Sequence, residues 1–269
     1  SRNKSRYAGS GHWDHSAIAF EGLARAIDAL AARSVLSKQA IHLLAHGRAA
    51  VTVRKQLKAD DWAGLVRALD RVEPSAANAE EVDAARHELI DACSAQESAL
   101  EAELRQGRSI RIAMGKWEHG GIRTDGVNAM IEPLAAFPHQ TDRGRLLLAQ
   151  AQLVVDLRKT LVACDWASAA TWTALATLLE GAPTELREAE EVQAAWQEFG
   201  EMRAATEAAT QSALDAGRSQ KLPSGGWSHE GIATEQLRSA LGELKAFPRV
   251  SDAGTALAAR AVRAIMIRE

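Results

Sequence analysis

The chain has 269 residues, of which 46% are apolar and only 4% aromatic, and seven of the aromatic residues are tryptophan. Its 32 basic and 35 acidic residues are well mixed and give a net charge of −3, so no basic block exists that would attract nucleic acid. No apolar run approaches the roughly 18 residues that a membrane span needs, so we expect no membrane insertion. Alanine and leucine dominate the apolar residues, which favours close-packed helices over sheets.

A tryptophan motif returns along the chain at nearly constant spacing. The step from Trp13 to Trp117 equals the step from Trp62 to Trp166 and is the short repeat spacing. The step from Trp117 to Trp227 is slightly greater and is the long repeat spacing. Residues 79–109 and 189–219 are identical at 14 of 31 positions, which is well above coincidence even in an alanine-rich chain. We therefore predict tandem repeats.

The predicted repeats divide the chain at the tryptophan motifs. The predicted segments are an inter-repeat loop at 1–12, a first repeat at 13–109, a second repeat at 110–219 and a truncated half-repeat at 220–269. Each full repeat is predicted to contain four helices.

The first helix of each repeat begins at Asp14, Glu118 or Ser228, because acidic and hydroxyl residues favour a helix N-terminus. In the second and third copies it ends before Phe137-Pro138 and Phe247-Pro248, since proline disfavours helix at the residue before it.

The second helix is predicted to begin at an N-cap hydroxyl, which is Ser37, Thr141 or Ser251. The third is short, at about 62–69 and 166–179. We place the six residues by which the long repeat spacing exceeds the short one after Trp166, around Thr171 to Thr184. The fourth runs over about 77–106 and 184–216, and the glycines Gly107 and Gly217 end it. No strand is expected, and the loops 109–116 and 219–226 are interpreted as the joints between repeats.

The fold class predicted from these elements is all-α. Tandem helical repeats of about 104–110 residues, four helices each, form either an elongated array of bundles or an α-solenoid. The sequence leaves these two geometries open. In both cases the neighbouring repeats of the same parent chain are the nearest partners.

The Trp-x-His triplet is the most specific motif, and a metal or ligand site is one interpretation of it. Its three histidines lie one repeat apart, however, so in a linear array they cannot converge on one ion. We interpret the motif as structural, with the tryptophan buried between units and the histidine bonded to a neighbouring carbonyl. The residues of this structural repeat motif are Trp13, His15, Trp62, Trp117, His119, Trp166, Trp227 and His229.

No other pattern points to chemistry. His42 and His46 share a helix face, but no His-Glu-x-x-His pattern accompanies them, so we expect no metal site. Gly120-Gly121 and Gly225-Gly226 lack the lysine and the preceding strand of a phosphate-binding loop, and we expect no cofactor and no catalytic residue. Cys93 and Cys164 form no CxxC motif and indicate a reducing compartment.

The sequence therefore predicts a non-enzymatic segment of a larger intracellular scaffold or structural protein, cytoplasmic or cytoskeleton-associated, that binds unidentified protein partners. The alternative is a regulatory or ligand-binding helical domain attached to an enzyme elsewhere in the parent chain. A pocket with convergent polar groups would favour this alternative. A di-metal helical-bundle enzyme would need inward Glu-x-x-His pairs, which the sequence lacks. We also expect the parent protein to continue past Glu269, because the third repeat lacks its last two helices.

Overall fold

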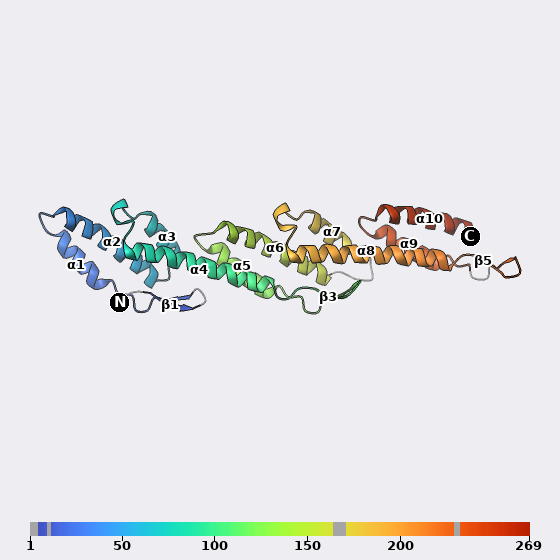
Figure 1. The fold of residues 1–269 in the computed structure, drawn as a ribbon, viewed down its shortest axis with the longest axis horizontal. Helices are drawn as coiled ribbons and strands as arrows, with labels where there is room; N and C mark the ends of the chain where they lie inside the picture. Colours follow the sequence, from blue (N-terminus) through green and yellow to red (C-terminus); the bar gives the residue numbers. More distant parts are fainter. Residues whose placement is uncertain (1–4, 10–11, 164–170, 229–231) are drawn as a thin grey trace. The chain divides into compact units, whose positions relative to one another are not determined.

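The computed structural model describes residues 5–9, 12–163, 171–228 and 232–269, and this part of the chain is mostly helical (Figure 1). The all-α class is confirmed, with three short hairpins added to the helices. The chain packs into two compact units, one made of Ser1–Leu104 with Gly126–Ala151 and the other of Arg105–Asp125 with Gln152–Glu269. No described helix combines the length and the apolar character that crossing a bilayer requires.

The first unit begins with a hairpin and continues through helices in which α2 contacts α1, α3 and α4. Its apolar core joins Ile18, Val53, Leu65 and Leu89 to Phe137. In chain order its elements are β1 (Arg6–Gly9), β2 (His12–Asp14), α1 (Glu21–Ala31), α2 (Lys38–Lys58), α3 (Trp62–Asp70), the 3₁₀ turn η1 (Pro74–Ala76), α4 (Glu80–Leu104), α5 (Asp125–Ala136) and the first part of α6 (Asp142–Ala163).

The second unit places its core around Trp172, which packs with leucines of α6 and α7 and with Phe199 and Phe247. A separate apolar cluster joins α9 and α10 to the C-terminal part of α8, and these three helices lie together in Figure 1. Besides the rest of α6, the elements of this unit are β3 (Ile110–Ala113), β4 (Lys116–Glu118), α7 (Trp172–Glu180), η3 (Thr184–Leu186), α8 (Glu190–Ala216), β5 (Gln220–Lys221), β6 (Trp227–Ser228), α9 (Glu235–Ala246) and α10 (Asp252–Arg268).

The predicted starts of the second helices are confirmed. The side chains of Ser37, Thr141 and Ser251 each accept a hydrogen bond from the backbone N–H three residues later, at 3.1, 2.9 and 2.9 Å. Such a bond satisfies one of the free N–H groups of the first helical turn. The predicted stops before the two Phe-Pro pairs are confirmed as well, since α5 ends at Ala136 and α9 at Ala246.

The prediction that the first helices begin at the Trp-x-His motif is wrong. These helices begin at Glu21, Asp125 and Glu235, and the motif lies instead at a β-hairpin. In the second hairpin, Arg111 pairs with Trp117 and the strands are joined through Gly115, which has φ +67°. Glycine adopts this left-handed conformation without steric cost, so it permits the tight turn. The loops predicted at 109–116 and 219–226 thus contain short strands.

The short third helix is confirmed at Trp62–Asp70, but its counterpart begins at Trp172. The Trp62 ring lies 5.9 Å from that of Phe137, and the Trp172 ring lies 6.0 Å from that of Phe247. Trp172 follows Trp62 by the long repeat spacing, and Phe247 follows Phe137 by the same spacing. The recurring contact therefore favours Trp172 over Trp166 as the counterpart of Trp62. Trp166 itself lies outside the described residues. The additional residues precede Trp172, so the prediction that they lie around Thr171 to Thr184 is wrong.

Candidate functional site

His15 is buried between two carboxylates in the first unit. Its Nδ1 lies 2.8 Å from Asp60 Oδ1 and its Nε2 lies 3.1 Å from Glu88 Oε2. The hydrogen bond to Glu88, with a smaller contribution from Asp60, raises the pKa of His15 against the opposing effect of burial. The doubly protonated imidazolium satisfies both acceptors. Because both ring nitrogens face carboxylates, neither is free to take a proton from a substrate or to ligate a metal.

The second unit pairs His119 with Glu198 of α8, with His119 Nε2 at 2.7 Å from Glu198 Oε1. Glu198 follows Glu88 by the long repeat spacing, so both histidines meet a glutamate at the corresponding place on the long helix. Burial lowers the pKa of His119, and burial together with the nearby Glu201 charge raises the pKa of Glu198 to about 8. The pair therefore holds one proton and stays neutral overall near pH 7.

Glu201 fastens the β3–β4 hairpin to α8. It accepts hydrogen bonds from the Gly115 backbone N–H at 2.8 Å and from Trp117 Nε1 at 3.0 Å, and it forms an ion pair with Arg111 at 2.6 Å. These donors, the Gly115 N–H foremost, hold the pKa of Glu201 at about 2. In the first unit the Trp13 indole N–H is buried and finds no acceptor among the described residues.

The tryptophans of the predicted motif differ in burial. Trp13, Trp62 and Trp117 are half-buried, and Trp227 is 58% exposed. The expectation that the motif tryptophan is buried is therefore wrong for Trp227 and only partly met elsewhere. The histidine bonds to carboxylates rather than to a neighbouring carbonyl, and His229 lies outside the described residues.

A set of three arginines escaped the sequence-based prediction. Arg54, Arg158 and Arg268 each donate from Nη1 to the backbone carbonyl of Ala19, Arg123 and Ala233, respectively, at 3.2, 2.7 and 3.4 Å. Donors and acceptors both follow the short and then the long repeat spacing, which is the signal that would have revealed them. Arg54 and Arg158 also form ion pairs with Glu81 and Glu191 of the long helices.

A second set of contacts binds the long helices to the N-cap hydroxyls. Glu97 of α4 accepts a hydrogen bond from Thr141, and Glu207 of α8 accepts one from Ser251. Cys93 Sγ, also on α4, donates to the His139 carbonyl at 3.1 Å, and burial raises the pKa of its thiol. The thiol is therefore inert and structural.

The other histidine pair has a structural contact of its own. His46 Nε2 lies 2.7 Å from the Ser75 carbonyl, at the turn that follows α3. Among the described residues, no group of three or more His, Cys, Asp and Glu side chains is arranged to hold a metal ion.

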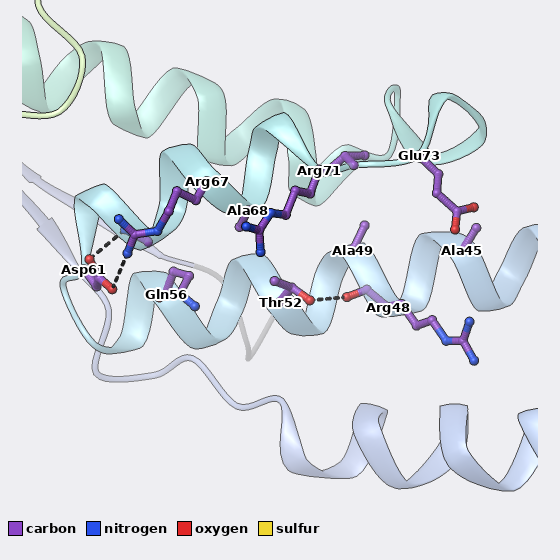
Figure 2. Close-up of a pocket in the computed structure, with 12 residues that line it drawn as sticks. Ala45, Arg48, Ala49, Thr52, Gln56, Asp61, Arg67, Ala68, Arg71 and Glu73 are labelled. Atoms are coloured by element: carbon purple, nitrogen blue, oxygen red, sulfur yellow. Dashed lines mark hydrogen bonds and ion pairs between the residues drawn. The ribbon is translucent and has the colours of Figure 1, made fainter.

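A pocket of about 370 Å³ lies between α2 and α3 (Figure 2). The small side chains of Ala45, Ala49 and Ala68 form part of its wall, and Arg67 and Arg71 lie along its α3 side. Its remaining lining residues are Arg48, Thr52, Gln56, Asp61, Gly64, Val72 and Glu73. The sequence motifs did not indicate this pocket, because its α3 arginines have no counterparts at the long repeat spacing.

In comparisons with known proteins, no family model, curated protein or solved structure matches the chain.

Proposed function

We propose that the chain is a non-enzymatic segment of a larger intracellular scaffold protein, built of tandem helical repeats and acting through protein–protein interaction. The observation that carries the proposal is the recurrence of Arg54, Arg158 and Arg268, each bonded to the carbonyl at the corresponding place before a first helix. A side chain and its acceptor that recur together support a repeated structural unit. The repeats extend as an array of bundles or an α-solenoid.

The polar groups of the motif support a binding function over a catalytic one. His15 is engaged at both nitrogens, and His119 shares a proton with a fully buried glutamate. Glu201 is occupied by the hairpin that it fastens. These side chains attach the hairpins to the helices, so their polar groups are already engaged in structural contacts. The buried free thiol of Cys93 fits a reducing, intracellular environment.

The proposal is tested by affinity capture from native lysate with the chain as bait, followed by reconstitution with each purified candidate. We expect at least one protein to bind directly with a defined stoichiometry and without turnover of any substrate. The control bait is an unrelated helical protein of similar size and charge. If the bait retains nothing beyond the control, or if a lysate metabolite is consumed catalytically, the scaffold proposal is wrong.

The α2–α3 pocket favours a second candidate, a regulatory or ligand-binding helical domain attached to an enzyme elsewhere in the parent chain. The pocket is open, and two cationic side chains lie along one of its walls. A small metabolite that raises the melting temperature of the isolated chain, in the absence of any protein partner, would support this candidate. Stabilisation only by a captured protein would support the scaffold.

A further inference from the structure

Arg67 of α3 and Arg71, the C-cap residue of this helix, line the pocket between α2 and α3 from one side. Arg67 and Arg71 are four residues apart, which places them on one face of the helix and its C-cap. Figure 2 shows the Arg71 side chain reaching from α3 toward Thr52 on α2, while the Arg67 guanidinium lies near Asp61. Arg48 also borders the pocket, but its guanidinium points away from α3 in the same view. Arg67 and Arg71 are thus the two cations on the α3 side of this groove.

Neither Arg67 nor Arg71 forms a strong ion pair with a described carboxylate. Arg71 has no ion pair among the described residues, and the nearest contact between Arg67 and Asp61 is 3.9 Å, with both side chains well exposed. An exposed pair of this kind contributes little and gives way readily to a better acceptor. Among the described residues, the carboxylates that line the pocket are Asp61 and Glu73, and the facing helix α2 contains no acidic residue.

The structure of the repeat does not require these arginines. At the positions one long repeat spacing later the chain has Thr177 and Gly181, and one short repeat spacing after Thr52 it has Asp156. Helix α7 still packs against α8 in the second unit without a cation at either place. Side chains that differ between copies of a repeat while the packing persists are free to serve an individual function.

We propose that the α2–α3 groove binds a phosphorylated serine or threonine side chain of a partner protein, with Arg67 and Arg71 as the residues that hold the phosphate. Two guanidinium groups match a dianion with several acceptor oxygens and give short, charge-assisted hydrogen bonds. The alanines of the groove leave room for an extended backbone beside the bound group. This inference rests on the proposed protein-binding function and gives that function a recognition chemistry.

The experiment measures binding of a fluorescein-labelled Ala-Ala-pSer-Ala-Ala peptide to the whole chain by anisotropy. We expect Arg67→Ala and Arg71→Ala each to weaken binding at least about tenfold, as the loss of a hydrogen bond to a charged group does. Arg33→Ala, which removes the same charge from the same unit outside the pocket, should leave binding unchanged. Both groove arginines are exposed, so thermal melts of these variants should match the unmodified chain.

Three further arms identify the source of the anion. The unphosphorylated peptide should not bind, a peptide with glutamate in place of phosphoserine should bind more weakly, and inorganic phosphate should compete. The proposal is overturned if the phosphopeptide does not bind, if Arg33→Ala weakens binding as much as the groove variants, or if inorganic phosphate occupies the groove while the phosphopeptide is excluded. If Arg67→Ala/Arg71→Ala bait still captures the same partners, this inference fails and the scaffold proposal stands; if no bait captures any partner, the scaffold proposal fails.

Discussion

Arg158 and Glu191 form a buried, bidentate ion pair in the second unit. Arg158 Nε lies 2.7 Å from Glu191 Oε1 and Nη2 lies 3.0 Å from Oε2, with the two side chains only 1% and 5% exposed. The same guanidinium donates to the Arg123 carbonyl, so one side chain joins α6, α8 and the segment before α5. Burial raises the pKa of Glu191, and the arginine opposes that shift.

We predict that Arg158→Met lowers the free energy of unfolding by about 3–5 kcal/mol, because it leaves Glu191 buried without its cation. The matched variant Arg54→Met breaks the more exposed pair with Glu81 and should cost on the order of 1 kcal/mol. Urea unfolding at pH 7 measures both. The Arg158→Met deficit should shrink toward pH 4.5, since Glu191 then takes up a proton without hindrance. Equal losses for the two variants would contradict the importance of burial.

The His119–Glu198 pair predicts a distinct pH dependence of stability. In the folded chain the pair holds one proton up to the Glu198 pKa of about 8, whereas the ordinary values are 4.5 for glutamate and 6.5 for histidine. From pH 6.5 to about 8 the unfolded chain holds none, so stability falls by about 1.4 kcal/mol per pH unit.

Glu198→Gln tests this account, because it leaves only the histidine with a lowered pKa. The contribution of the site should then rise as the pH increases toward 6.5 and stay level above it, since the folded site no longer carries the extra proton. The measurement is urea unfolding of both proteins at intervals from pH 4.5 to 8.5. Parallel stability curves for the two proteins would show that the pair does not share a proton.

Gly254 adjoins the contact between Glu207 and Ser251, and it predicts a glycine-specific effect. A Cβ at this position would lie 2.5 Å from Glu207 Oε1 and 2.5 Å from Val250 Cγ1. We predict that Gly254→Ala lowers the free energy of unfolding by about 1–3 kcal/mol, because the glutamate must move from the N-cap. Gly200 lies inside α8 with nothing within 4 Å of the corresponding Cβ, so Gly200→Ala should stabilise by up to about 1 kcal/mol. Opposite signs in thermal unfolding are the expected result.

Local signals in the sequence predicted the N-caps of the second helices and the stops before the two Phe-Pro pairs, whereas the hairpins depend on contacts far away in the chain. Ser37, Thr141 and Ser251 act within one turn, so the residue type alone indicated each cap. Strands of two to four residues are too short to show a periodicity. The β3–β4 hairpin is held by Glu201, which is 84 residues from Trp117. No local rule identifies that partner.

The candidate site divides in the same way. The Trp-x-His motif was visible because it recurs, and its carboxylate partners Glu88 and Glu198 recur with it, although only the structure shows the pairing. The pocket between α2 and α3 was not predicted from the sequence, because Arg67 and Arg71 do not recur at the repeat spacings. Repetition therefore indicated part of the structural contacts, although the recurring arginines Arg54, Arg158 and Arg268 were missed, and it gave no signal for residues that occur in one unit alone.

Trp172 and Trp227 differ in burial, so we predict that their replacement has different costs. Trp172 is fully buried and packs against Phe199 and Phe247 with ring centroids 6.2 and 6.0 Å away, whereas Trp227 is exposed. Trp172→Ala should cost about 3–5 kcal/mol because it opens a cavity in the core. Trp227→Ala should change stability by less than about 0.5 kcal/mol. Urea unfolding measures both, and Trp172→Ala should also remove the most blue-shifted part of the fluorescence. A large loss for Trp227→Ala would instead indicate that this hairpin is packed against another surface in solution.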